Sequence, residues 1–266
     1  MVRKTAVAGH FYPADKNALE RELQKMVPPA AQRRKVLGLL APHAGYGYSG
    51  SCAGQGYARV ELSETIIVLG VNHRGIGAAL AVDGNDYWET PLGRVEVNRE
   101  RGSRLLGASK IFRLDSEAGR LEHSLEVQVP FIQHAGPGSR ILPIVVAASR
   151  LDDLLAAGRE IAGLFTPGAS LMMVASSDMS HYIPAVHARE LDTLAIERML
   201  QLDAEGLYRV VRDQHISMCG VAPAVIMLSA ARAAGASGAE LVCYTNSGEV
   251  SGDMDEVVGY ASLVVY

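Results

Sequence analysis

Short runs of consecutive apolar residues alternate along this chain with longer segments in which apolar residues recur every three or four positions. The apolar runs predict buried strands at 36–40, 65–70, 141–147, 171–175, 241–245 and 257–265. The periodic segments predict helices at 15–27, 51–60, 125–134, 151–165, 186–201, 204–214 and 222–234. Continuous apolar runs are typical of strands that helices cover on both faces of a sheet. The alternation therefore predicts an α/β fold with a central, mostly parallel or mixed sheet flanked by helices.

Two segments interrupt this alternation. A polar, basic break at 28–35 separates the first helix from the rest of the chain. Further on, short strand-like runs at 79–82 and 95–97 flank a stretch that contains Tyr87 and Trp88. We expect a hairpin-like excursion over one end of the sheet, with this aromatic pair on the rim of a pocket and not in a core strand. No linker divides the chain, so residues 1–266 are predicted to form a single domain.

Composition and charge narrow the class of protein. The 266 residues are 48% hydrophobic, and 25 basic against 29 acidic residues give a formal charge of −4. Without a basic cluster to neutralise phosphates, nucleic acid is not expected as a main partner. The apolar runs are shorter than the ~20 residues that a bilayer requires, and no signal peptide is visible. The scattered cysteines, Cys52, Cys219 and Cys243, favour a reducing compartment, so we expect a cytoplasmic protein.

Three of the predicted strands are each followed by a histidine. These residues are His43, His73 and His181, the last preceded by Asp178. Ligands bind beyond the carboxyl ends of the strands in open α/β sheets, so we expect these side chains at one edge of the sheet. Each alone could be a hydrogen-bonded loop residue. Together they favour a transition-metal site, because neutral imidazole is the commonest protein ligand for such ions.

Two further segments could complete such a site. Cys219 precedes a predicted helix, whose N-terminal amides favour a thiolate, and the alternative is a small buried residue. The segment with Glu122, His123, Ser124 and Glu126 either caps a helix or places these side chains beside the pocket as hydrogen-bonding support. The pattern alone leaves both alternatives open at each place.

Two other kinds of chemistry lack their sequence signals. Ser176, Ser177 and Ser180 lie beside an acid and an imidazole, but no Gly-x-Ser-x-Gly turn surrounds them, and a triad is normally assembled from distant segments. The glycines at 70–77 do not follow the Gly-x-Gly-x-x-Gly order of a dinucleotide site. Neither a serine hydrolase nor a dinucleotide enzyme is therefore predicted.

Seven strings in the chain together are similar to the Memo family, whose prokaryotic members form the AmmeMemoRadiSam system protein B group. They are Ala-Gly-His-Phe-Tyr-Pro (8–13), Ala-Pro-His-Ala-Gly-Tyr (41–46), Gly-Val-Asn-His (70–73), Glu-His-Ser-Leu-Glu (122–126), Ile-Leu-Pro-Ile (141–144), Ser-Ser-Asp-Met-Ser-His (176–181) and Met-Cys-Gly (218–220). The likeness spans nearly the whole chain.

This resemblance implies a fold similar to that of the class III extradiol ring-cleaving dioxygenases, which bind Fe(II) through two histidines and a carboxylate. In Memo-type proteins a cysteine replaces the carboxylate, so the implied metal ligands here are His43, His73 and Cys219. We expect the tips of these three side chains within about 4 Å of one another, as ligand bonds of roughly 2.0–2.3 Å require.

The predicted catalytic residues are His181 and Asp178, which the resemblance implies, and His123, from its segment beside the pocket. His181 would be an acid/base that does not bind the metal, and Asp178 would help to set its orientation and protonation. Because sulfur favours softer or redox-active ions, the expected cofactor is Fe(II) or copper.

The predicted function is that of a metal-binding oxidoreductase acting on a small catechol-like or other O₂-reactive substrate. One alternative is a non-enzymatic adaptor that holds a metal or a peptide in the inherited cavity. Another is a component of a system with a radical SAM enzyme and an AMMECR-type protein as partners. Fold alone does not decide among these functions.

Overall fold

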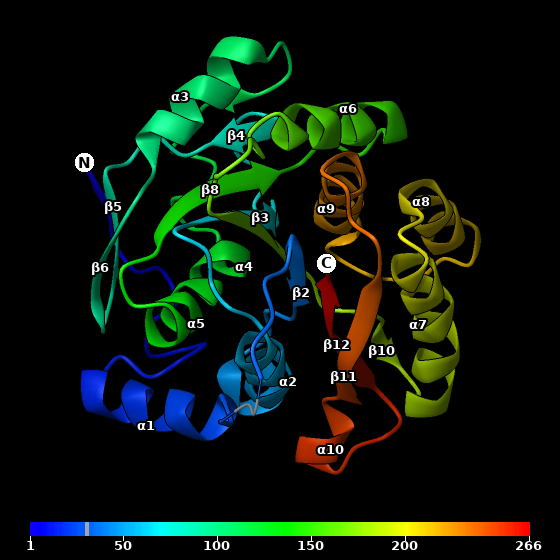
Figure 1. Cartoon of the computed structure of the whole chain (residues 1–266). Helices are drawn as coiled ribbons and strands as arrows, with labels where there is room; N and C mark the ends of the chain where they lie inside the picture. The colour runs from blue at the N-terminus through cyan, green and yellow to red at the C-terminus, as the bar shows by residue number, and fades with distance from the viewer. Residues whose placement is uncertain (30–31) are drawn as a thin grey trace.

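The computed structural model describes residues 1–29 and 32–266 and is built on one large mixed β-sheet (Figure 1). Its central strands are parallel and lie in the order β2 (Gly38–Ala41), β9 (Leu171–Ser176), β3 (Thr65–Val71) and β8 (Arg140–Val146). Antiparallel neighbours flank them, namely β12 (Val257–Val265) beside β2 and β4 (Leu80–Val82) beside β8. The outermost strands are β10 (His181–Ile183) and β11 (Ala239–Asn246) on β12, and β7 (Arg113–Leu114) on β4. Residues 30–31 of the predicted break at 28–35 lie outside the described residues.

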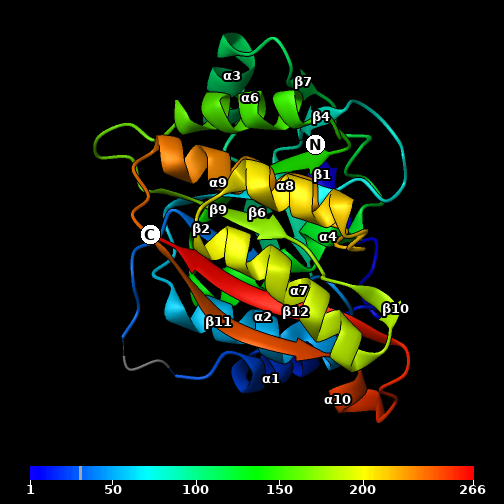
Figure 2. The ribbon, with the colours of Figure 1, turned by 90° about the vertical axis from the view of Figure 1, so that its right-hand side faces the viewer.

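Helices cover both faces of this sheet, as Figures 1 and 2 show from two sides. One face is packed by α3 (Arg99–Ala108), α6 (Leu151–Ala162), α7 (Ala185–Leu200), α8 (Ala204–Asp213) and α9 (Val221–Ala233). The other face is packed by α1 (Lys16–Met26), α2 (Tyr46–Arg59), α4 (His123–Glu126) and α5 (Gln128–Ala135). A short helix, α10 (Gly248–Ser251), follows β11. The predicted α/β class, with a mixed central sheet flanked by helices, is confirmed.

The central strands are apolar except at their ends, where Thr65, Arg140 and Ser176 lie, because both faces of the sheet are buried. Leu39 and Ile66 point into the core beneath α1, α2 and α5, whereas the next residue on each strand, Leu40 and Ile67, points into the core beneath α6 and α9. Successive side chains of a strand alternate between the two faces. A sheet with helices on both sides therefore requires apolar residues at consecutive positions, which is the pattern that the sequence carries.

The parallel arrangement places the candidate site. Since β2, β3 and β9 run in the same direction, the loops that follow them leave from the same edge of the sheet. His43, His73 and Asp178 lie on these three loops. His43, His73 and Asp178 therefore leave from the same edge, whereas His181, the third histidine of the expected group, begins β10, which pairs with β12.

A small second sheet contains the expected hairpin, in which Tyr87 is 40% exposed, but the expectation that Trp88 lies on the rim of a pocket is wrong. β5 (Tyr87–Thr90) pairs with β1 (Val2–Arg3) and β6 (Gly93–Glu96), and Trp88 on β5 is 1% exposed within a core. The guanidinium of Arg3 lies 4.1 Å from the centre of the Trp88 ring, and the indole N–H donates to Asp83. Because a buried indole needs a partner for its N–H, Asp83 and Arg3 make this a core position and not a pocket rim.

Some element boundaries differ from the prediction. The helix predicted at 51–60 begins at Tyr46, and the segment predicted as one helix at 125–134 forms α4 and α5. Helix α3 was not predicted, because few of its residues are apolar; its first turn is capped by Asn98, whose side chain accepts from the N–H of Arg101. No helix within the two described ranges has the length and apolar character needed to cross a membrane.

Candidate metal centre

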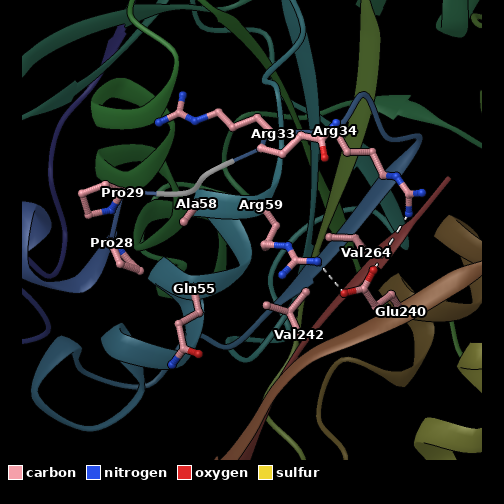
Figure 3. Close-up of a pocket in the computed structure, with 11 residues that line it drawn as sticks. Pro28, Pro29, Arg33, Arg34, Gln55, Ala58, Arg59, Glu240, Val242 and Val264 are labelled. Atoms are coloured by element: carbon pink, nitrogen blue, oxygen red, sulfur yellow. Dashed lines mark hydrogen bonds and ion pairs between the residues drawn. The ribbon is translucent and has the colours of Figure 1, made fainter.

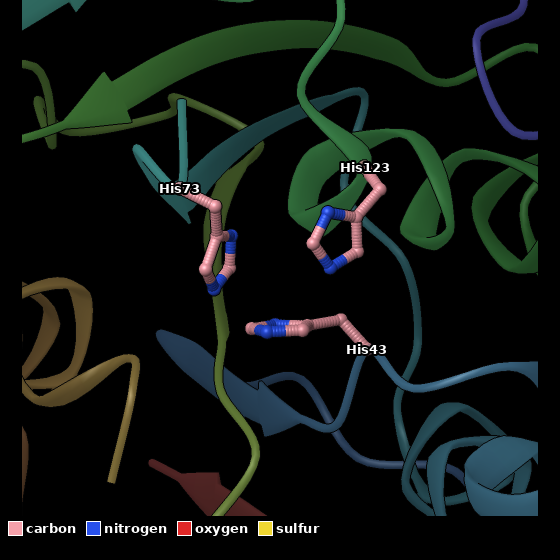
Figure 4. Close-up of side chains that lie close together, drawn as sticks. All are labelled: His43, His73 and His123. Atoms are coloured by element: carbon pink, nitrogen blue, oxygen red, sulfur yellow. The ribbon is translucent and has the colours of Figure 1, made fainter. Parts of the chain in front are cut away.

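Three histidine rings converge at the carboxyl edge of the central strands (Figure 4). His43 follows β2, His73 follows β3, and His123 is the first residue of α4. Each offers one ring nitrogen to a group whose atoms all lie within 4.8 Å of one another. The ring centre of His43 is 5.3 Å from that of His73 and 5.4 Å from that of His123, and the ring centres of His73 and His123 are 4.6 Å apart. Such a group could hold a metal ion.

Hydrogen bonds fix the tautomer of His43, which is 2% exposed. Its Nδ1 lies 3.0 Å from the hydroxyl of Ser176, which donates its own proton to the carbonyl of Ser124 at 2.6 Å. The same hydroxyl accepts from the amide of Gln128 at 2.8 Å. A hydroxyl has one proton to give, so Ser176 must accept from His43. Nδ1 of His43 therefore carries the proton, and Nε2 keeps a free lone pair.

Glu122 orients the other two rings. Its carboxylate accepts from the backbone N–H of His73 at 2.8 Å and lies 2.9 Å from Nδ1 of the same residue. Nδ1 of His123 lies 3.2 Å from the same carboxylate oxygen, which also accepts from the N–H of Ser124 at the start of α4. A carboxylate that holds Nδ1 of an imidazole leaves Nε2 free and raises its basicity, an arrangement common behind metal-ligating histidines.

The charge states of these groups suit a cation. Burial lowers the pKa of His43 to about 4. The charge of Asp178 raises this pKa, and the nearby His123 and His73 lower it, so the ring is neutral at pH 7. Burial would raise the pKa of Glu122, but hydrogen bonds from His123, His73 and Ser124 outweigh burial and hold the pKa well below its ordinary value. Free imidazole lone pairs backed by a buried anion form a donor set that fits a transition-metal ion.

Cys219 approaches the same histidine from the other side. Cys219 lies in the loop before α9. Its Sγ is 3.2 Å from Nε2 of His43 and accepts from the N–H of Asp178 at 3.3 Å. Burial raises the pKa of the Cys219 thiol well above its ordinary value, and the charge of Asp178 raises it further. The helix N-terminus therefore does not by itself make a thiolate here, and a bound cation would have to displace the thiol proton. The ligand set His43, His73 and Cys219 stays a prediction.

Asp178 and His181 take different partners from those expected. The carboxylate of Asp178 accepts from the N–H groups of His43 at 2.7 Å and Ala44 at 3.3 Å, so it positions the His43 loop. His181 donates its backbone N–H to the hydroxyl of Ser217 at 2.7 Å, and its Nδ1 lies 2.9 Å from the Ser217 carbonyl. A carbonyl only accepts, so Nδ1 carries the proton and Nε2 is free. Ser217, rather than Asp178, sets the orientation of His181.

Two cavities lie at opposite edges of the sheet. One of about 740 Å³ is lined by Arg34, Arg59 and Glu240 (Figure 3). Both arginines pair with Glu240, at 3.9 and 2.7 Å, and the described residues that line this cavity include no histidine or cysteine. Val264, also in its wall, is paired with Leu39 near the start of β2, so this cavity is at the amino edge, away from the histidines. The other, of about 430 Å³, includes Cys219 in its wall.

Sequence reasoning placed His123 beside the pocket but not among the metal ligands. The available signal was its neighbour Glu122, since a carboxylate next to a histidine at a helix start can orient more than one ring. The spacing along the chain could not show that α4 packs against the end of β3, where Ser124 donates to the carbonyl of Val71 at 3.0 Å.

Comparisons with known proteins agree on one family. The family model described as Memo-like protein matches residues 3–264. A MEMO1 family protein of Methanosarcina barkeri is 43% identical over 267 residues, covering 99% of this chain and 100% of the relative. Another, of Aquifex aeolicus, is 40% identical over 265 residues, covering 99% and 98%. The crystal structure of the uncharacterized protein JW3007 from Escherichia coli K12 matches with a TM-score of 0.57 at 15% identity, covering 86% of this chain and all of that one, a likeness in fold alone.

Proposed function

The chain belongs to the Memo family, and we propose that it binds Fe(II) or copper between His43, His73 and a third ligand, and acts as an oxidoreductase on a small catechol-like substrate. The observation that carries this proposal is the convergence of three imidazoles whose Nδ1 atoms each face Ser176 or Glu122. Structural hydrogen-bonded histidines have no need to converge in this way.

The third ligand is either Cys219 or His123. The resemblance to Memo-type proteins favours Cys219, whose Sγ is 3.2 Å from His43. The ring geometry favours His123, which shares Glu122 with His73. Both side chains approach His43, so this residue belongs to either ligand set.

A bound redox-active ion would supply electron transfer and a positively charged anchor for substrate oxygens. The protein's own part is positioning and proton transfer. Asp178 and Ser176 hold His43 in place from its backbone and from Nδ1. His181, whose Nδ1–H is engaged with Ser217, keeps Nε2 free to take a proton from a substrate hydroxyl and to return it.

The first experiment measures metal content after purification without oxygen and reloading with Fe(II) or Cu(I). Wild type should bind one equivalent, and His43→Ala should lose it whichever third ligand is used. The matched control is His187→Asn on α7, where the histidine is exposed and lies 3.5 Å from Glu190. Retention of the metal by His43→Ala would contradict the site.

Two variants then identify the third ligand. If Cys219 binds, Cys219→Ser should lose metal affinity and any thiolate-to-metal charge-transfer absorption, while His123→Asn keeps both. If His123 binds, the order is reversed. Loss of a ligand should weaken metal affinity by at least the roughly 10–100-fold that outer partners of a metal site contribute.

The second experiment tests the oxidoreductase. Metal-loaded protein should consume oxygen with a catechol, and His181→Gln should keep its metal but lose turnover. Metal loss in this variant would place His181 among the ligands instead. Metal binding without oxygen uptake on any catechol would favour the alternative of a non-enzymatic, metal-holding adaptor.

A further inference from the structure

The cavity of about 430 Å³ beside Cys219 has the form of a site for a small ligand. It lies at the carboxyl ends of β3 and β8, is bordered by α6, α8 and the start of α9, and is open to solvent. Val71, Val146, Leu154 and Pro223 give it apolar walls. Its volume is within the range of about 300–1,000 Å³ typical of small-molecule sites, which are mostly apolar with a few placed polar groups.

The cavity shares one residue, Cys219, with the surroundings of the candidate metal centre. Cys219 lines it, and the Sγ of this residue is 3.2 Å from Nε2 of His43. Asn72, the neighbour of His73, lines it as well. The three histidines are not among the described residues that line the cavity, so a ligand in it would approach the candidate centre from the side of Cys219.

The cavity wall also contains an exposed guanidinium, that of Arg212. Arg212, near the end of α8, donates from Nη1 to the hydroxyl of Tyr208 at 2.8 Å. That hydroxyl in turn donates to the carbonyl of Ser149 at 2.7 Å, and both Tyr208 and Ser149 line the same cavity. These two hydrogen bonds limit the positions open to the Arg212 side chain, so it loses less conformational freedom when a ligand binds.

Arg212 differs from its neighbour on the same helix. Arg209 pairs with Glu205 at 2.8 Å, whereas no carboxylate among the described residues is within ion-pairing distance of Arg212. In a chain of formal charge −4, an arginine that faces an apolar cavity without an acidic partner is available to an anion from solution. A guanidinium binds a carboxylate through two parallel hydrogen bonds.

We propose that this cavity binds the substrate of the metal centre and that Arg212 selects a substrate carrying a carboxylate. The apolar walls would contact a ring or short carbon skeleton, Arg212 would hold the carboxylate, and the other end of the molecule would lie beside Cys219. This inference rests on the proposed function, because it treats the ligand as the substrate of that site.

The test compares two probes that differ by one carboxylate, 3,4-dihydroxybenzoate and catechol. Their binding to metal-loaded protein is measured by calorimetry, after metal content has been determined. We expect 3,4-dihydroxybenzoate to bind at least about tenfold more tightly, as a charged hydrogen-bonded pair of about 1.5–3 kcal/mol predicts. Arg212→Gln should remove this preference, Arg212→Lys should restore part of it, and the control Arg209→Gln should leave it unchanged.

The outcomes separate this inference from the proposed function. If the chain holds no metal, the proposed function fails, and the same titration on metal-free protein still tests the cavity, where Arg212→Gln should again weaken 3,4-dihydroxybenzoate alone. If the chain holds metal but binds both probes equally, or if Arg212→Gln keeps the preference, the inference is overturned. It is also overturned if neither probe binds.

Discussion

Glu126 is the last residue of α4, the helix that His123 begins. Replacing Glu126 by glutamine tests whether its buried ion pair with Arg3 holds the N-terminal segment against α4. The carboxylate pairs with Arg3 at 2.6 Å, and both side chains are at most 2% exposed. It also accepts from the N–H groups of Ala6 and Val7, at 2.8 to 3.0 Å, and from the hydroxyl of Tyr12 at 2.7 Å. Every group around the carboxylate is thus a donor.

Glu126→Gln removes the negative charge and turns one acceptor into an NH₂ group facing donors. Breaking a buried pair by removing one partner costs about 3–5 kcal/mol, because the other charge remains buried without compensation. This loss is a large part of the roughly 5–15 kcal/mol by which domains are stable. For a chain of this size it corresponds to a fall in Tm of roughly 10 °C.

The assay is urea unfolding at pH 7 of wild type, Glu126→Gln and Glu117→Gln. Glu117 pairs with Arg120 at 2.8 Å, but the two side chains are 68% and 57% exposed, so the control should lose at most about 1 kcal/mol. Arg3→Met combined with Glu126→Gln should cost less than the sum of the two single variants, because no unpaired charge is then buried. Equal stabilities for Glu126→Gln and Glu117→Gln would refute the reasoning.

Two further predictions concern helix packing and pH. Gly54→Ala on α2 should lower the free energy of unfolding in urea by at least about 2 kcal/mol, because its methyl group would collide with the backbone oxygen of Met26. Gly47→Ala on the same helix has open space around it, so its free energy of unfolding should stay the same or rise by up to about 1 kcal/mol. Equal effects of the two substitutions would contradict the close approach of α1 and α2. In metal-free protein, the pKa of His43 is 6.5 in the unfolded chain and about 4 in the folded chain. Between these pH values the unfolded state therefore binds more protons than the folded state, and the free energy of unfolding falls as the pH falls. Over that interval wild type should lose about 3 kcal/mol more than His43→Asn in urea titrations with a chelator present, and parallel curves would show that the ring is not buried in its neutral form.

The sheet could be predicted from the sequence because its strands are buried on both faces. Leu39 and Leu40 serve opposite cores, so the apolar run in β2 is visible without any knowledge of its neighbours. Partly exposed elements carry weaker signals. Helix α3 has few apolar residues, and Trp88 could be placed in a core only by its partners Asp83 and Arg3, which are decided by tertiary contacts.

The candidate site was predictable to the extent that strand ends determine it. His43 and His73 follow parallel strands, and the rule that such ends meet at one edge brings them together. His123 and Cys219 enter from helix termini, whose approach to that edge depends on how α4 and α9 pack. Sequence spacing carries no information on that packing, so the residues left Cys219 open as a ligand and only the resemblance selected it, and the role of Ser217 in orienting His181 could not be inferred at all.

The choice of third ligand and the choice of metal depend on each other. Cys219 must lose a proton to bind, and burial together with Asp178 raises the pKa of its thiol. His123 faces Glu122 through Nδ1, and a neutral imidazole in this orientation can bind an ion through Nε2 without losing a proton. A soft ion such as Cu(I) gains most from sulfur and can offset the cost of deprotonating Cys219, whereas Fe(II) gains less from it. We therefore expect Cys219→Ser to weaken Cu(I) more than Fe(II), and His123→Asn to weaken Fe(II) at least as much as Cu(I). Metal content measured with one ion alone would assign the ligand set for that ion only.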